Sequence, residues 1–239
     1  MSDPVRDLIL VLADTKRLLG MRYAEWILGA PALEAGIACA SMAQDEWGHG
    51  RLLYALLKDF GDDVEQLEHG READAYRNIE LLDTSPTSWP DLVVVNALVD
   101  AAVSVQLEAL RESDYAPLRQ RVGKILDEEE FHAAHGAAWL KRIAGASADT
   151  RHMIGAAVDR ALPVLLRWFG RGTSGDALRA RFLDRVTPLL DTVELRAPRD
   201  AQPDFAGFDE ATRRGQQRGP DVATIARIRG DKNRAFLMD

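Results

Sequence analysis

The chain has 239 residues, of which 46% are hydrophobic and 28% charged, so it is long and apolar enough to bury one sizeable core. Its 30 Lys and Arg residues against 38 Asp and Glu residues give a net charge of -8, which argues against a global electrostatic grip on nucleic acid or on an anionic membrane. The single cysteine, Cys39, excludes an internal disulfide and a thiolate zinc cluster.

We expect no apolar run of the roughly 18 to 20 residues that spans a bilayer. The acidic N-terminus does not resemble a signal peptide. These features predict a cytoplasmic protein that binds neither nucleic acid nor a membrane.

Four long helices are predicted, because apolar residues recur every three to four positions in four stretches. Gly29 and Pro31 separate the first two stretches by a short turn, which makes those helices antiparallel neighbours. The polar stretch 62–88 is expected to be a crossover connection with one short helix. The predicted helices cover about 8–28, 31–60, 89–113 and 117–143.

Two further helices are expected over about 149–169 and 176–193, and no stretch alternates like a β-strand. The predicted fold is therefore all-α: a four-helix bundle with additional C-terminal helices and an ordered tail, which we expect to lie on its own bundle or on a neighbouring subunit. The chain is predicted to form a single domain, 1–239. Its parts are a core bundle of about 4–145, extra helices of about 149–193 and a tail of 194–239.

The second and fourth predicted helices each contain a Glu-x-x-His motif, formed by Glu46 and His49 and by Glu129 and His132. Three residues of separation place a carboxylate and an imidazole on one helix face. One such motif is weak evidence, because Glu and His often lie three apart on exposed helices. Two motifs in successive hairpins are stronger, since bundles that hold two iron or manganese ions use one from each of two helices and one carboxylate from each of the others.

The carboxylate of the first helix is predicted from height along the bundle. Glu46 lies 16 residues after a turn centred on Ala30, and Asp14 lies 16 residues before it, whereas Glu25 lies only 5 before it. Residues equally far from a hairpin turn lie at the same height. Asp14 is therefore the predicted ligand.

The same comparison applies to the second hairpin, whose turn lies near Tyr115. Glu129 is 14 residues after the turn and Asp100 is 15 before it, whereas Glu108 is only 7 before it. Asp100 is therefore the second predicted carboxylate, and both aspartates lie in apolar stretches that should face the core. The predicted metal ligands are Asp14, Glu46, His49, Asp100, Glu129 and His132.

Other polar residues of these helices have more ordinary interpretations. Lys16 and Arg17 crowd the helix of Asp14, so the first metal position is less complete than the second. His135, one turn after the second motif, is expected to support the ligands or to lie on the surface. Glu25 and Glu108 lie toward the hairpin ends, where contacts at helix ends or between helices are the default.

With these residues in hand, the chain resembles the phenylacetic acid catabolic family, the oxygenase subunits of the bacterial phenylacetyl-CoA epoxidase, over about 8–140. ADTKRLLGMRYAEWILGAPALE resembles the non-catalytic structural subunit, whereas MAQDEWGHGRLLY, LVDAAV and DEEEFHAAHG resemble the catalytic subunit, whose QDE-x-GHG and EE-x-FH segments hold the metals. The catalytic subunit has a Glu on its first helix, and that position falls near Lys16 or Arg17 here. Asp14 is one turn away from it.

The resemblance implies a ferritin-like fold and two iron ions, with manganese as an alternative. It implies a monooxygenase that inserts oxygen from O2 into an aromatic or acyl-CoA thioester substrate, with electrons from a separate reductase. It also implies a homodimer, or a heterodimer with a paralogous subunit. Two alternatives stay open: a non-catalytic structural subunit with vestigial ligands, and a ferroxidase of the ferritin class.

Overall fold

The computed structural model describes residues 3–197, 202–215, 219–230 and 236 of the chain. Within these residues the secondary structure is helical, apart from one isolated bridge between Asp209 and Arg214, which confirms the predicted all-α fold. The α-helices are α1 (Pro4–Ala24), α2 (Leu33–Leu56), α3 (Val64–His69), α4 (Trp89–Val94), α5 (Asp100–Ala109), α6 (Ala116–Ala146), α7 (Ala148–Trp168), α8 (Gly172–Asp191) and α9 (Val222–Arg229).

The first helix begins and ends earlier than its apolar pattern indicates. Asp3 caps α1 by accepting hydrogen bonds from the backbone N–H groups of Val5 and Arg6, and Pro4 occupies a position where no N–H is needed. The helix ends at Ala24, so a connection of eight residues, 25–32, joins it to α2. The predicted short turn at Gly29 is therefore longer than expected.

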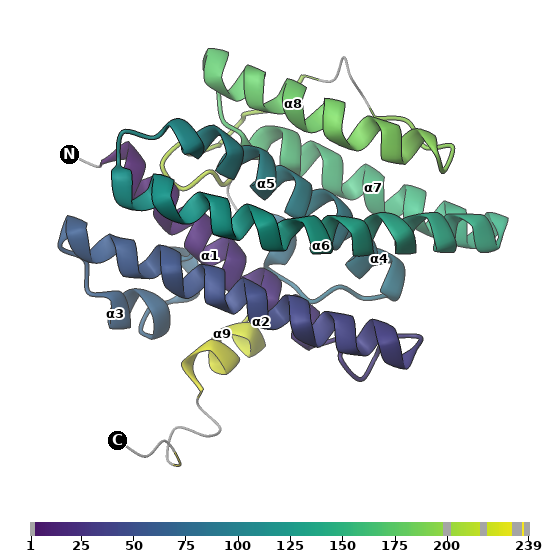
Figure 1. Cartoon of the computed structure of the whole chain (residues 1–239), viewed down its shortest axis with the longest axis horizontal. Helices are drawn as coiled ribbons and strands as arrows, with labels where there is room; N and C mark the ends of the chain where they lie inside the picture. Colours follow the sequence, from purple (N-terminus) through teal and green to yellow (C-terminus); the bar gives the residue numbers. More distant parts are fainter. Residues whose placement is uncertain (1–2, 198–201, 216–218, 231–235, 237–239) are drawn as a thin grey trace.

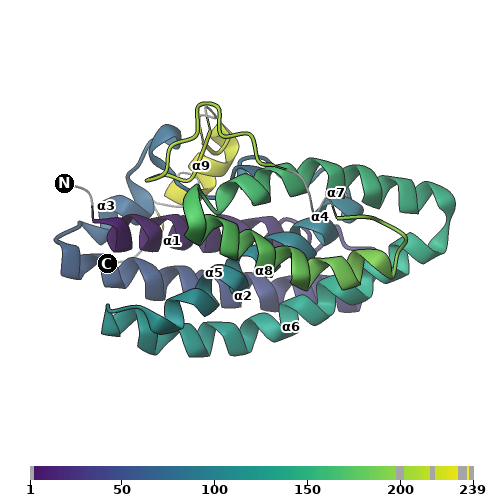
Figure 2. The same ribbon diagram turned by 90° about the horizontal axis from the view of Figure 1, so that it is seen from above.

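The core is a four-helix layer to which the later helices are added. α1 packs along α2, α2 lies beside α6, and α6 contacts α4 and α5 (Figures 1 and 2). α7 packs on α4 and α6, and α8 packs on α5. The two predicted hairpins and the two extra helices are thus present in the expected order.

The third predicted helix is a continuous helical run that changes its pitch in the middle. α4 passes into a π-helical segment, Val95–Val99, which leads directly into Asp100 at the start of α5. A π-helical turn inserts an extra residue and changes the direction of the side chains near it, often at functional sites. This segment sets the orientation of Asp100 relative to α6.

The run Trp89–Glu112 differs from the expectation that no stretch has the length and composition of a membrane span. Its mean hydropathy is 1.6, and 83% of its most apolar window is buried inside the protein. Its apolar side chains therefore contact the other helices, as those of a central core helix do.

The described parts of the tail lie on the chain's own bundle. Arg214 forms a buried ion pair with Asp83, and Arg22 of α1 donates to the Thr224 hydroxyl of α9, a helix that the sequence pattern does not predict. Ile225 and Ile228 anchor α9, being 6% and 4% exposed. The tail residues 198–201, 216–218, 231–235 and 237–239 lie outside the described part, and the single-domain assignment stays a prediction.

A matched pair of glycines in α6 tests the packing of this helix against the π-helical segment. A Cβ at Gly136 would lie 2.9 Å from Asn96 Oδ1 and 3.0 Å from the Ala97 nitrogen, whereas a Cβ at Gly123 would meet nothing within 4 Å. We expect Gly136→Ala to lower the free energy of unfolding by about 1–3 kcal/mol through overpacking. Gly123→Ala should raise it by about 0.5–1 kcal/mol through helix propensity. Thermal unfolding measures both, and shifts of the same sign would contradict the close packing.

Candidate metal centre

Four side chains of the kinds that bind metals converge inside the bundle. Glu46, Asp100, Glu129 and His132 each offer one ligand atom, and these atoms lie within 4.8 Å of one another. All four side chains are buried, with at most 3% of their surface exposed. We call these four residues the cluster. The structure thus brings together four of the six predicted ligands, and their role as ligands stays a prediction.

The cluster residues lie on the core-facing stripes of their helices. Successive members of each stripe are three or four residues apart, so they share one helix face. On α2 the stripe is Cys39, Met42, Glu46, His49 and Leu53; on α6 it is Val122, Ile125, Glu129, His132 and Gly136.

Lys16 of α1 completes the cluster from the third side. It lies on an α1 stripe whose other members are apolar or aromatic, and all of them are 0% exposed: Ile9, Leu12, Leu19 and Tyr23. Its Nζ lies 2.9 Å from Glu46 Oε1 and 2.6 Å from Glu129 Oε1. A fully buried ammonium therefore bridges two glutamates from different helices.

The ion pairs fix the charge state of the cluster. Burial opposes the charge of Lys16, but the negative charges of Glu129, Glu46 and Asp100 outweigh it and raise the pKa of Lys16. Burial likewise favours a neutral Glu129, but the ammonium and the neighbouring histidines hold the pKa of Glu129 below its usual range. Both partners of the pair therefore stay charged at neutral pH.

The other two members share the remaining charge. Burial would lower the pKa of His132, but the hydrogen bond to Glu46 and the nearby carboxylates raise it to about 9. Burial, together with the charges of Glu129 and Glu46, raises the pKa of Asp100 to about 7. At neutral pH two cations, Lys16 and His132, thus face the two glutamates, and Asp100 is partly protonated.

His49, the fifth predicted ligand, lies at the edge of the cluster. Its Nε2 lies 2.5 Å from Glu128 Oε2, and its Nδ1 lies 3.4 Å from Glu129 Oε1. The ring is 1% exposed. It contacts the cluster through Glu129 but is not one of its four members.

Asp14, the sixth predicted ligand, does not reach the cluster. Its Oδ1 accepts hydrogen bonds from Tyr54 and from Arg71, and its Oδ2 accepts from Arg71 at 2.9 Å and from the Arg77 backbone at 2.8 Å. Residues two apart on a helix point about 200° apart, so Asp14 and Lys16 cannot share one face. The structure places Lys16 where Asp14 was expected.

The structure adds two polar side chains that the motif search did not select. Tyr23 donates to Asp100 Oδ2 at 2.6 Å, and Asn96 donates to the same oxygen at 2.8 Å. Asn96 Oδ1 also lies 2.9 Å from His135 Nδ1, so His135 supports the cluster from outside. Their signals in the sequence are positional: Tyr23 lies seven residues after Lys16 on one stripe, and Asn96 lies four residues before Asp100.

The remaining polar residues considered above lie away from the cluster. Glu25 pairs with Arg22 and Arg227, and Glu108 pairs with Arg181 and Arg185 of α8. Arg17 pairs with Glu68 of α3. These are the helix-end and inter-helix contacts expected for Glu25 and Glu108.

The donor set of the cluster fits a cation. Five buried polar atoms around it have no hydrogen-bond partner among the described residues: Glu46 Oε2, His49 Nδ1, Asp100 Oδ1, Glu129 Oε2 and His132 Nδ1. Carboxylate and imidazole atoms of this kind suit iron or manganese.

Two metal ions do not fit around Lys16, however. A unit charge about 4 Å from another repels it by about 4 kcal/mol at an effective dielectric of 20, and a divalent ion doubles this figure. The ammonium is fully buried, so it cannot move its charge into solvent without rearrangement. The α1 position that would supply a carboxylate to a second ion carries a cation instead.

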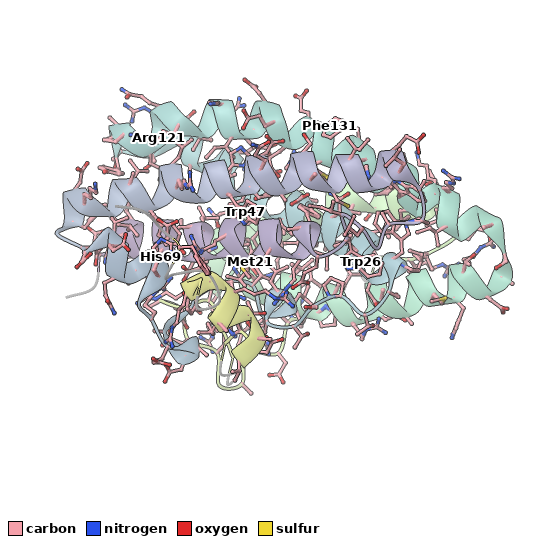
Figure 3. The ribbon with its side chains drawn as sticks, turned by 90° about the horizontal axis from the view of Figure 1, so that it is seen from below. Met21, Trp26, Trp47, His69, Arg121 and Phe131 are labelled. Carbon is pink, nitrogen blue, oxygen red and sulfur yellow. The ribbon has the colours of Figure 1, made fainter. Side chains whose placement is uncertain are left out.

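The cavities of the described part lie beside the cluster rather than on it. The larger, about 920 Å³, lies between the α1–α2 hairpin, α3 and α9, and its walls include Met21, Trp26, Trp47 and His69 (Figure 3). A second, of about 510 Å³, is lined by His135 and Trp139 among others. Neither is lined by a member of the cluster.

Comparison with known proteins agrees with the geometry. The profile of the phenylacetic acid catabolic protein family matches residues 2–216, which confirms the resemblance and the ferritin-like class of the bundle. Two different components of the 1,2-phenylacetyl-CoA epoxidase of Escherichia coli (strain K12) are similar to this chain. The first is 28% identical over 191 residues, covering 72% of this chain and 62% of that protein. The second is 27% identical over 203 residues, covering 84% of this chain and 79% of that protein. The chain thus spans less than two thirds of the length of the first component.

The contacts of Asp14 lead to a prediction about stability. Asp14→Asn would leave the Arg71 guanidinium buried without its countercharge, which costs about 3–5 kcal/mol of unfolding free energy. Glu72→Ala is the control, because Glu72 is exposed and pairs only with Arg229 at the surface, so its loss should cost less than about 1 kcal/mol. Chemical denaturation measures both values. Equal losses would contradict the assigned contacts of Asp14.

Proposed function

This chain belongs to the phenylacetic acid catabolic protein family, and we propose that it is an accessory oxygenase-type subunit in a complex of the phenylacetyl-CoA epoxidase kind. In this proposal a paralogous chain holds the metal centre and the two chains pair as a heterodimer in the cytoplasm. The observation that carries the proposal is the Lys16 ammonium, which lies between Glu46 and Glu129. It supplies, from the protein itself, a positive charge that the cluster would otherwise need from metal ions.

The burial of the cluster also supports an accessory role. An oxygenase needs room for its substrate next to the metals, and drug-sized ligands occupy cavities of about 300–1,000 Å³. Two cavities of this size are present, but other residues line them. The cluster residues are instead packed among core side chains and bonded to one another.

A second candidate is the monooxygenase itself, which would insert oxygen from O2 into an aromatic or acyl-CoA thioester substrate with electrons from a separate reductase. The convergence of the cluster and its unpaired ligand atoms favour this candidate. Two iron ions, or manganese, would be held by the cluster and His49 and would supply the oxygen chemistry. This function requires Lys16 to leave the cluster, and a homodimer would suffice for it.

Asp100→Asn separates the two candidates with little disturbance of the fold. Asn keeps the shape of the side chain and an oxygen that accepts from Tyr23 and Asn96, and Asp100 is already partly protonated at neutral pH. Asn is a much poorer ligand for a ferrous ion than a carboxylate. The variant therefore removes a ligand but leaves most of the packing.

We expect a complex of this chain with its paralogous partner and a reductase to consume phenylacetyl-CoA and oxygen at a rate that Asp100→Asn changes by less than about twofold. The equivalent substitution in the paralogous partner should lower the rate by about 100-fold or more. Light scattering checks that both variants still assemble. A loss of about 100-fold from Asp100→Asn in an intact complex would assign the monooxygenase activity to this chain instead.

A further inference from the structure

We infer that Lys16 is a built-in cation that takes the place of a divalent metal, and that the cluster is a latent site which binds one such ion when the ammonium is removed. The inference rests on the same cluster as the proposed function but concerns binding by the isolated chain. It is carried by the position of Lys16, by the geometry of the four donors and by the atoms that Lys16 leaves unpaired. Each of these is independent of turnover.

The position of Lys16 is that of a shared cation. Its Nζ contacts one oxygen of Glu46 and one of Glu129, from α2 and α6, while Lys16 itself comes from α1. It thereby joins three helices of the bundle at one point. A metal ion bound by the same two glutamates would occupy the same space and join the same helices.

The four donors are close to the arrangement that a metal needs. Metal–oxygen and metal–nitrogen distances of about 2.0–2.2 Å place opposite donors about 4.2 Å apart. In the cluster all donor atoms lie within 4.8 Å of one another while an ammonium holds them. Small side-chain movements therefore suffice to close them around one ion.

A second buried ion pair on α1 serves as an internal comparison. Both oxygens of Asp14 are used by Arg71, Tyr54 and the Arg77 backbone, so that pair is complete without any further group. In the cluster, by contrast, one oxygen each of Glu46, Asp100 and Glu129 has no partner among the described residues. Buried polar atoms are normally hydrogen-bonded, so a set of unpaired ligand atoms around one point indicates an incompletely used binding site.

Electrostatics make the ammonium and a divalent ion mutually exclusive. With Lys16 in place, the two glutamates already face two cations, Lys16 and His132. Removal of the ammonium leaves two buried carboxylates with one imidazolium, and a buried charge without a partner is strongly destabilising. A divalent ion restores the balance, and it also displaces the proton of His132, because a metal ligand must be neutral imidazole.

The test is a titration of the untagged full chain with CoCl2, comparing the natural protein with Lys16→Met, which keeps a long unbranched side chain but removes the charge. We expect Lys16→Met to retain about one cobalt per chain after gel filtration and to show the visible absorption of protein-bound cobalt. Its affinity should exceed that of the natural chain by at least about 100-fold. Cobalt should raise the midpoint of thermal unfolding of Lys16→Met only.

Two controls locate the effect. Arg17→Met removes the neighbouring cation, which pairs with Glu68 outside the cluster, and should leave cobalt binding as weak as in the natural chain. The double variant Lys16→Met with Asp100→Asn removes a donor and should lose the cobalt that Lys16→Met retains. If Lys16→Met folds only when cobalt is present, that dependence supports the inference, because the ion then replaces the ammonium.

Three results would overturn the inference. They are a folded Lys16→Met that retains no cobalt, a Lys16→Met that stays unfolded with and without cobalt, and a natural chain that retains stoichiometric cobalt which Asp100→Asn removes. The last result would also favour the monooxygenase candidate. The first two would leave the accessory role in the complex unaffected, since turnover of the complex decides that question.

Discussion

A buried cluster of carboxylates must be balanced by positive charge, and in this protein the balance comes from a lysine of the first helix. Charged groups lose several kcal/mol of hydration on burial, and only close opposite charges offset that loss. The Lys16 ammonium is 0% exposed and contacts Glu46 and Glu129 directly. The helices that supply these three residues are therefore tied together by an internal ion network, around which the apolar core is packed.

The same network decides what the bundle does. Related scaffolds that hold two metal ions obtain their positive charge from the metals, and their helices supply mainly negative and neutral ligands. Here one residue of α1 changes the sign of its contribution, while the Glu-x-x-His motifs of α2 and α6 and the aspartate of α5 stay. The π-helical segment and its Asn96 still orient Asp100 toward α6. The ligand framework is thus preserved around a cation that belongs to the chain.

Much of this architecture can be predicted from the sequence. Helical periodicity predicts the hairpins, and spacing along the helices predicts that Glu46, Asp100, Glu129 and His132 converge. The choice of Asp14 fails for two physical reasons. The count from the turn assumes a short connection, whereas eight residues join α1 to α2, and height along the axis does not say which way a side chain points.

The partners of buried charges are harder to predict than their positions. Asp14 is buried as its apolar neighbours suggest, but it pairs with Arg71 from the crossover segment, whose course no periodic pattern encodes. The informative signal for Lys16 is its place on a stripe of otherwise apolar or aromatic residues, Ile9, Leu12, Leu19 and Tyr23. A lysine at such a position must find a buried counter-ion. The unpredicted α9 follows the same rule, because its contacts depend on Arg22 and Asp83 of distant segments.

The central claim is that the ammonium of Lys16, rather than a metal ion, lies between the two glutamates. A crystal structure of the chain grown with a manganese or iron salt, with diffraction data collected at the absorption edge of that metal, tests the claim most directly. The account predicts Lys16 Nζ in contact with Glu46 and Glu129 and no anomalous signal inside the cluster. An anomalous peak bridging the two glutamates, with the lysine side chain turned away, would contradict it.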